Sequence, residues 1–267
     1  MNPLSLNTFN GSPWVGGAGD LGRWADAAAA AGFALLGPDC PSIDAWLATG
    51  RTMAGLSRRL RDAGIGCEIV GVCAMLDGSA QQRAALAQAT RHAQALGANF
   101  LQVNVSAPDA AARLAAVEQA ATAVAGTGLR LALEYMPITP LCTLAETLAI
   151  VTSIGTDTVG ALVDNWHHAH DPQGWETLAD APLDAIAYVE FDDAQPAPAN
   201  ASLDDETMHR RTFPGTGVLE CARFASLCRA RGYNGVVSVE VLDRAWRDRP
   251  LSEFADTCFA TTRPHWA

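Results

Sequence analysis

Four acidic residues each close a short apolar run in the second half of the chain. They are Glu134, Asp164, Glu190 and Glu240, and the runs read LRLALE, TVGALVD, AIAYVE and GVVSVE. An apolar run that ends in one carboxylate is typical of a buried strand whose last side chain faces a site. Carboxylates that converge repel one another unless they hold a cation. The pattern therefore predicts one divalent metal ion with oxygen ligands, Mn²⁺ or Mg²⁺ before Co²⁺ or Zn²⁺.

Histidine follows one of these carboxylates closely. After Asp164 the chain reads NWHHAH, which places His167 three residues beyond the carboxylate and at the mouth of the same loop. Histidine titrates near neutral pH, so His167 could contact a substrate oxygen or act as an acid or base. The alternative is that these histidines cap the next helix or lie on the surface. Trp166, in the same segment, could stack on a substrate ring or pack.

The elements that must position these residues alternate along the chain, and strand starts recur about every 30 residues, the length of a βα unit. The expected strands are 4–9, 33–37, 66–70, 100–104, 129–134, 158–164, 185–191 and 235–240. The expected helices lie near 20–31, 50–64, 80–96, 109–126, 142–154, 173–180, 218–231 and 251–262. Glycines at the helix ends, such as Gly32 and Gly97, support these boundaries.

Strands that are apolar on both faces and separated by amphipathic helices predict a parallel sheet covered by helices. Eight such units predict an α/β fold, a single (β/α)8 TIM barrel over residues 1–267. An open doubly wound sheet is the alternative, but it would usually carry a glycine-rich phosphate loop after the first strand, and NGSPW is no such loop. In a barrel, neighbouring strand ends lie about 5 Å apart, so the four carboxylates can meet at the mouth.

The connection over residues 192–217 is much longer than the others and ends in RRTFPGTG. Long loops after barrel strands open onto the face that carries the active site, so we expect this one to cover the substrate. A disordered insertion is the alternative.

Polar and aromatic residues near the early strands could complete the mouth. Asn7, Glu68, Gln102 and Asn104 lie on or near expected strand ends and could bind substrate hydroxyls. Glu68 lies inside an expected strand, where a carboxylate would need a partner, and the alternative is that it faces a helix junction. Trp14, after the first strand, could stack on a substrate ring or pack.

Composition narrows the class of partner. The 267 residues carry a net charge of −11, with a pI of about 4.9, which argues against nucleic acids and anionic membranes as partners. No apolar run approaches the length of a membrane span, the N-terminus resembles no signal peptide, and the seven cysteines form no CxxC pair. We expect a cytoplasmic protein that acts on a small molecule.

The chain resembles the xylose isomerase-like TIM barrel superfamily, the sugar phosphate isomerase/epimerase group. The matching segments are LALEYMP, LVDNWHHAH, IAYVEFDDA, RRTFPGTGVLE and GYNGVVSVEVL, which span most of residues 129–242. The resemblance implies that Glu134, Asp164 and Glu240 bind one divalent metal ion and that His167 contacts the substrate. It also implies that Arg211 reaches a polar substrate oxygen, and it allows a homodimer.

Glu190 departs from the pattern of that superfamily, which usually has histidine there, or glutamine in several relatives. Four carboxylates around one divalent ion leave an excess of negative charge. A cation such as Arg211 could offset it, one carboxyl could keep its proton, or Glu190 could step back from the metal.

The resemblance implies a metal-dependent isomerase or epimerase that acts on a sugar or keto-polyol through an enediolate. Glu134 and Glu240 would flank the reacting carbon, one removing the proton and the other returning it. A metal-dependent dehydratase (lyase) of the 3-dehydroshikimate or inosose type is the first alternative, with Arg211 on a substrate carboxylate. A non-catalytic metabolite-binding barrel is the second. Endonuclease IV-like enzymes share the superfamily, but they need more histidines than the six of this chain and basic loops that contact DNA, which argues against a nuclease.

Overall fold

The computed structural model describes residues 2–198 and 200–267, with only the backbone at Val72 and Cys73. Its main sheet has eight parallel strands in the order β2-β1-β10-β7-β6-β5-β4-β3. The strands are β1 (Leu4–Asn7), β2 (Leu35–Gly37), β3 (Ile69–Leu76), β4 (Phe100–Val105), β5 (Arg130–Glu134), β6 (Val159–Asp164), β7 (Ile186–Phe191) and β10 (Val237–Val239). All eight correspond to expected strands, although β3 starts later and runs further than 66–70.

The two edges of this sheet meet, so it closes into a barrel. Parallel bridges join Leu35 to Gly66 and Asp39 to Gly71. The Leu36 amide also donates to the Gly66 carbonyl at 3.0 Å. Gly66 allows this close approach, because a Cβ at that position would lie 2.9 Å from a Leu35 methyl group. The (β/α)8 barrel predicted from the sequence is confirmed.

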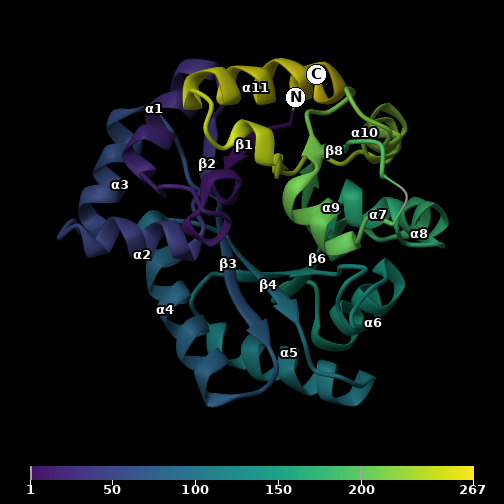
Figure 1. The fold of residues 1–267 in the computed structure, drawn as a ribbon. Coiled ribbons are helices and arrows are strands. Elements are labelled where there is room, and N and C mark those ends of the chain that lie inside the picture. Colours follow the sequence, from purple (N-terminus) through teal and green to yellow (C-terminus); the bar gives the residue numbers. More distant parts are fainter. Residues whose placement is uncertain (1, 199) are drawn as a thin grey trace.

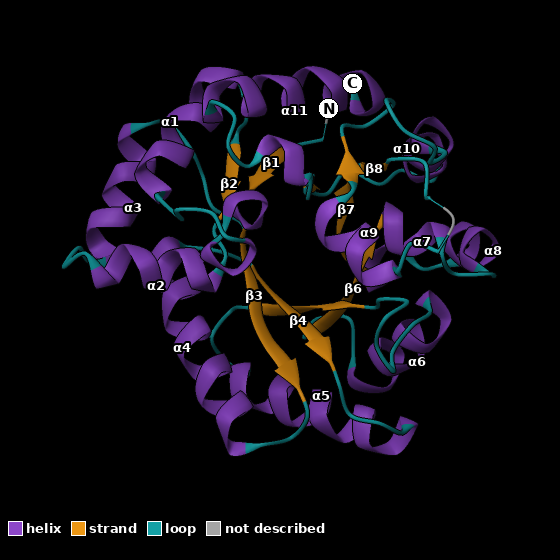
Figure 2. Cartoon of the chain, viewed as in Figure 1, coloured by secondary structure: helices purple, strands orange, loops and turns teal. Residues whose placement is uncertain are grey.

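Most of the helices surround the strands as an outer ring, whereas α9 (Leu203–His209) lies nearer the centre of the view (Figures 1 and 2). They are α1 (Leu21–Ala31), α2 (Cys40–Ala48), α3 (Met53–Asp62), α4 (Ala80–Leu96), α5 (Ala110–Val124), α6 (Leu144–Ile154), α7 (Asn165–Ala169), α8 (Gly174–Asp180), α9 (Leu203–His209), α10 (Cys221–Ala230) and α11 (Leu251–Trp266). The yellow C-terminal helix α11 packs beside α1, so the two ends of the chain share one side of the ring. None of the helices in the described ranges is long and apolar enough to cross a membrane.

Helix α2 was not expected. Asp39 caps it by accepting a hydrogen bond from the Ser42 amide at 3.0 Å, and a proline lies in its first turn. Both are ordinary start signals of a helix. The expected helix 50–64 is α3, which is capped by Thr52 in the same way.

An apolar cluster fills the barrel interior toward the N-terminal ends of the strands. It contains Leu35, Ile69, Ala132, Leu162, Ala187, Tyr188 and Val236, with Phe100 packed against it. Ala132, Leu162 and Tyr188 each lie two residues before one of the acidic residues on β5, β6 and β7. Side chains two apart on a strand share a face, so those carboxylates point into the barrel above this apolar cluster.

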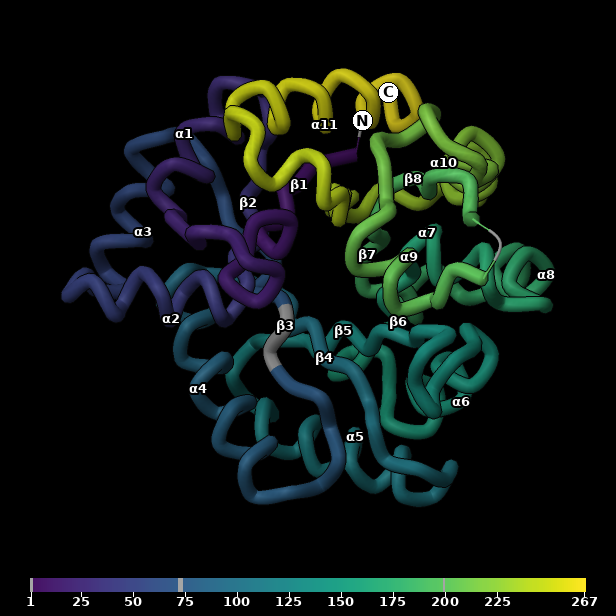
Figure 3. Tube along the Cα trace, in the orientation of Figure 1, coloured from purple at the N-terminus to yellow at the C-terminus, as the bar shows by residue number. Residues whose placement is uncertain are grey.

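The segment after β7 is folded, in place of the long loop expected at 192–217. Strand β8 (Asp193–Ala194) pairs antiparallel with β9 (Arg211–Thr212), and α9 lies between them in sequence. Ala199 lies outside the described residues. Figure 3 shows α9 close to α7, and a hydrogen bond from Trp166 to Glu206 joins the two helices.

Candidate functional site

The four acidic residues predicted from the sequence lie together at the C-terminal ends of their strands. Glu134 ends β5, Asp164 ends β6, Glu190 lies in β7 and Glu240 follows β10 directly. All four side chains are buried, and Asp164 and Glu190 are direct neighbours in the strand register.

Their ligand atoms form two overlapping groups. Glu134, Asp164 and His167 make one group, and Asp164, Glu190 and Glu240 make the other. Within each group the candidate ligand atoms all lie within 4.8 Å of one another. Because Asp164 belongs to both, the two groups form one site.

Neutral amides from the early strands hold these carboxylates. The Asn7 Nδ2 atom lies 3.1 Å from Glu190 Oε1 and 2.9 Å from Glu240 Oε1, so one amide bridges two acids. Gln102 and Asn104 each donate to Glu134 Oε2 at 2.7 Å. We expected these three amides to bind substrate hydroxyls, but the structure places their donors on the carboxylates.

His167 lies inside the cluster. Its Nε2 atom is 3.1 Å from Glu134 Oε1 and 3.9 Å from Asp164 Oδ2. Its Nδ1 atom is buried without a hydrogen-bond partner among the described residues. Asp164 fixes the backbone that carries this ring, because its Oδ1 atom caps α7 and accepts from the amides of Trp166 (2.6 Å) and His167 (3.1 Å).

Arg211 is buried against the same site, where protein groups bind both of its Nη atoms, while its Nε atom has no partner among the described residues. Its Nη1 atom donates to Asp164 Oδ2 at 2.7 Å and also contacts Asp192 Oδ2. Its Nη2 atom donates to Thr207 Oγ1 at 2.9 Å, and its guanidinium lies 4.8 Å from the centre of the Trp166 ring. These contacts make Arg211 a counter-charge for the acidic cluster, one of the roles considered for it.

The remaining predicted residues fall in different places. Trp166 is completely buried and donates through Nε1 to Glu206 on α9 at 2.9 Å, so it packs beneath Arg211. Trp14 is 70% exposed in a short 3-10 helix after β1, on the face that carries the site. Glu68 precedes β3, at the opposite end of the barrel, and its carboxylate contacts Asn99, so the structure does not bring Glu68 to the site.

Burial and mutual repulsion shift the proton affinities of the acids. Burial, together with Glu240, Glu134 and Asp164, raises the pKa of Glu190 well above its ordinary value. Burial and nearby acids also raise the pKa of Glu240 to about 8, although Arg211 opposes the shift. Burial alone would raise the pKa of Asp164, but Arg211 and His167 outweigh it and lower that pKa.

Two acids that the sequence analysis did not single out organise the segment after β7. Asp192 pairs with Arg211, and burial raises its pKa well above the ordinary value despite that pairing. Asp193 accepts hydrogen bonds from the amides of Gly215 (3.0 Å), Gly217 (2.9 Å) and Leu219 (2.8 Å), which fixes the PGTG turn. The signal for both was the acidic pair that directly follows a strand in the motif VEFDDA.

Comparisons with known proteins agree with this fold. A family model described as xylose isomerase-like TIM barrel matches residues 25–257. The inosose isomerase of Halalkalibacterium halodurans is 26% identical over 137 residues, which cover 51% of this chain and 47% of that protein. The 3-dehydroshikimate dehydratase of Pseudomonas putida is 31% identical over 97 residues, which cover 36% of this chain and 15% of that protein.

Among solved structures, the IOLI protein with a zinc atom bound superposes with a TM-score of 0.84 at 16% identity, covering 100% of this chain and 98% of that chain. At this identity the likeness shows the fold. This chain spans about half the length of the inosose isomerase that it matches.

Proposed function

Because the chain belongs to the xylose isomerase-like TIM barrel family, we propose that it is a divalent-metal-dependent isomerase or epimerase of a sugar-like or polyol-like substrate. The observation that carries this proposal is the convergence of four buried carboxylates and one histidine at the barrel mouth. The partial similarity to inosose isomerase supports a cyclic or open-chain keto-polyol as the substrate class.

The side chains present fit a hard divalent cation. Glu134, Asp164 and Glu240 would hold it, and Glu190, whose Oε2 atom has no protein partner among the described residues, is placed to join them. Without a cation, burial and the neighbouring acids raise the pKa values of Glu190 and Glu240, which is a costly arrangement for buried acids. The IOLI protein, which has a similar fold, binds a zinc atom, which supports a metal-binding role for this chain.

The chain's own residues supply the proton chemistry. A divalent ion, when bound, polarises a substrate carbonyl. Glu134 and Glu240 come from β5 and β10, which are separated in the sheet by β6 and β7, so their carboxylates approach from different sides. One removes the proton next to the carbonyl, and the other returns it. His167, between Glu134 and Asp164, can donate to or accept from a substrate oxygen.

The alternative, a dehydratase, is favoured by the similarity to 3-dehydroshikimate dehydratase. That reaction acts on a substrate with a carboxylate, for which Arg211 was the expected partner. Arg211 is instead engaged by Asp164, Asp192 and Thr207. This arrangement supports the isomerase or epimerase reading over the dehydratase.

The test is proton exchange. Metal-replete protein is incubated in deuterated water with keto-sugars and keto-cyclitols, and NMR follows the loss of the proton next to the carbonyl. Glu134→Gln and Glu240→Gln should each slow the exchange by at least about 100-fold. Glu118→Gln, an exposed glutamate on α5, is the matched control and should leave the rate unchanged.

Parallel incubation with 3-dehydroshikimate, followed by ultraviolet absorbance of the unsaturated product, tests the dehydratase. Product formation without proton exchange in keto-sugars or keto-cyclitols would replace the first proposal with the second. A calorimetric metal titration covers the non-catalytic alternative, because wild-type protein that binds no Mn²⁺ or Mg²⁺ would contradict both enzymatic proposals.

A further inference from the structure

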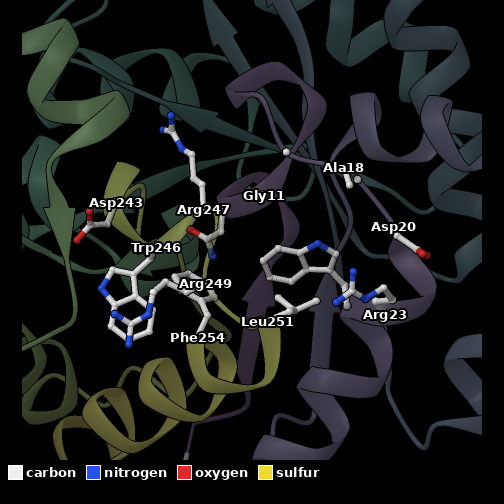
Figure 4. Close-up of a pocket in the computed structure, with 14 residues that line it drawn as sticks. Gly11, Ala18, Asp20, Arg23, Asp243, Trp246, Arg247, Arg249, Leu251 and Phe254 are labelled. Carbon is white, nitrogen blue, oxygen red and sulfur yellow. The ribbon is translucent and has the colours of Figure 1, made fainter.

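A pocket lies on the rim of the barrel, between the β1–α1 connection and the segment that follows β10 (Figure 4). It encloses about 630 Å³, including its opening to solvent. None of the four carboxylates of the metal centre lines it, although Asn10 and Asp243 in its wall each lie three residues beyond a side chain of that centre.

Arginine dominates the charge of this rim pocket. The chain carries a net charge of −11, and all 18 of its basic residues are arginines, yet three of them, Arg23, Arg247 and Arg249, line this one pocket. Figure 4 shows Arg23 on the side of α1 and the other two on the side of the segment after β10. Arg247 is 2.9 Å from His209 Nδ1, and Arg249 pairs with Glu253 at 2.6 Å.

Arg23 differs from these two, because its side chain is exposed and no hydrogen bond or ion pair engages it within the described ranges. The two aspartates of the wall have partners. Asp20 accepts from the Gly22 amide at 3.1 Å and lies 3.7 Å from Arg51, and Asp243 accepts from the Ala245 amide at 2.8 Å and from Gln195 at 3.1 Å. Among the described residues, Arg23 is therefore the charged residue of the lining whose side chain has no protein partner.

The walls of the rim pocket are closely packed before any ligand arrives. A Cβ on Gly11 would lie 2.6 Å from the Trp24 ring, and a Cβ on Gly17 would lie 2.0 Å from the Gly11 carbonyl oxygen, so both positions need glycine. Trp24 is held in turn by an edge contact with Phe254, with ring centres 6.0 Å apart. Asn10 donates to backbone carbonyls through Nδ2, while its buried Oδ1 atom has no partner in the described part of the chain.

We propose that this rim pocket binds an oxyanion, a carboxylate or phosphate group, through Arg23, with Arg247 and Arg249 supplying further positive charge. A planar guanidinium matches both groups in shape and hydrogen bonding. The aromatic wall gives the attached organic part of the ligand an apolar surface. The proposal is independent of the proposed reaction, because it uses no residue of the metal centre.

Calorimetric titration of the metal-replete protein with inorganic phosphate at low ionic strength tests it. Arg23→Glu should weaken phosphate binding by about tenfold or more, since a charge-assisted hydrogen bond is lost and a like charge is added. Arg58→Glu on α3 makes the same change at an exposed arginine outside the pocket and should leave the affinity within about twofold. No phosphate binding by wild type, or equal weakening in the two variants, would overturn the proposal.

Two further measurements separate this site from the metal centre and identify the source of the oxyanion. Phosphate binding that persists in Glu240→Gln supports the rim pocket even if the proposed reaction fails, whereas its loss there places the phosphate on the metal and overturns the proposal. A ketohexose is then compared with its terminal phosphate ester. Tighter binding of the ester that disappears in Arg23→Glu assigns the oxyanion to the substrate. Equal binding of both, with phosphate still bound, assigns it to a separate ligand, and either result supports the site.

Discussion

The late strands β5, β6, β7 and β10 end in carboxylates, whereas the early strands β1 and β4 bring amides to the same mouth. The carboxylates supply the charge that a cation needs. Asn7, Gln102 and Asn104 add no charge, but their donors hold the carboxylate oxygens in place. The difference shows how one half of a barrel can gather like charges while the other half only orients them. Arg211, from the segment after β7, offsets part of the resulting repulsion.

The largest effect on stability should come from removing the positive charge of Arg211. Arg211→Met leaves Asp164 and Asp192 buried without their cation, which should cost about 3–5 kcal/mol of unfolding free energy. Urea denaturation of the metal-free protein measures the loss, with Arg58→Met on the surface as control. A loss below about 1 kcal/mol would mean that the acids of the late strands do not depend on Arg211.

The amide half is tested by Asn7→Ala, which removes the donor shared by Glu190 and Glu240. Loss of a group that orients metal ligands typically lowers metal affinity by about 10–100-fold, and calorimetry with Mn²⁺ should show this. Asn99→Ala removes a similar amide–carboxylate contact at the other end of the barrel and should not change the affinity. Equal effects of the two variants would show that Asn7 only stabilises the fold.

Glu190→Gln should show how the charge at position 190, apart from the shape of the side chain, affects stability. The glutamine keeps an oxygen that can accept from Asn7 and Ser238 but removes one of the repelling charges. We expect the metal-free protein to become more stable by about 1 kcal/mol, and the stabilisation by added Mn²⁺ to become smaller. Thermal melts with chelator measure the stability of the metal-free protein, and melts with Mn²⁺ measure the stabilisation by the metal. A metal-free variant less stable than wild type would contradict the repulsion inferred at this position.

The last expected effect is a dependence of the stability on pH. The pKa of Glu240 in the folded protein, about 8, lies above its ordinary value of 4.5, so the unfolded chain binds fewer protons between these values. The metal-free protein should therefore lose stability as pH rises from about 4.5 to about 8. Saturating metal should flatten this slope. Urea midpoints measured across that interval would contradict the idea if they rise with pH in the presence of chelator.

The strands and the acidic cluster were predictable because both follow from short-range patterns. Apolar runs closed by Glu134 and Asp164 mark strand and site together, and the period of two along a strand fixes which side chains face inward. Glu68 was misplaced because the centre of its apolar run was taken for the centre of the strand, whereas β3 begins one residue later.

The partners of Arg211 could not be read from the sequence in the same way. Its contacts with Asp164 and Thr207 join three separate elements, β6, α9 and β9, and depend on how the segment after β7 folds back. The start signals of α2 were present in the sequence, but its nine residues were too few to show helical periodicity.

The closure of the barrel has a mechanical consequence. Strands β2 and β3 meet through isolated bridges, while each of the other neighbouring pairs of strands shares at least three paired residues. This junction is a seam, and the free energy needed to part it is lower than for the rest of the wall. Amide protons of Leu36, Gly66 and Gly71 should exchange with solvent deuterium before those of β5 and β6. The barrel would then open locally between β2 and β3, while the strands that carry the acidic residues stay paired.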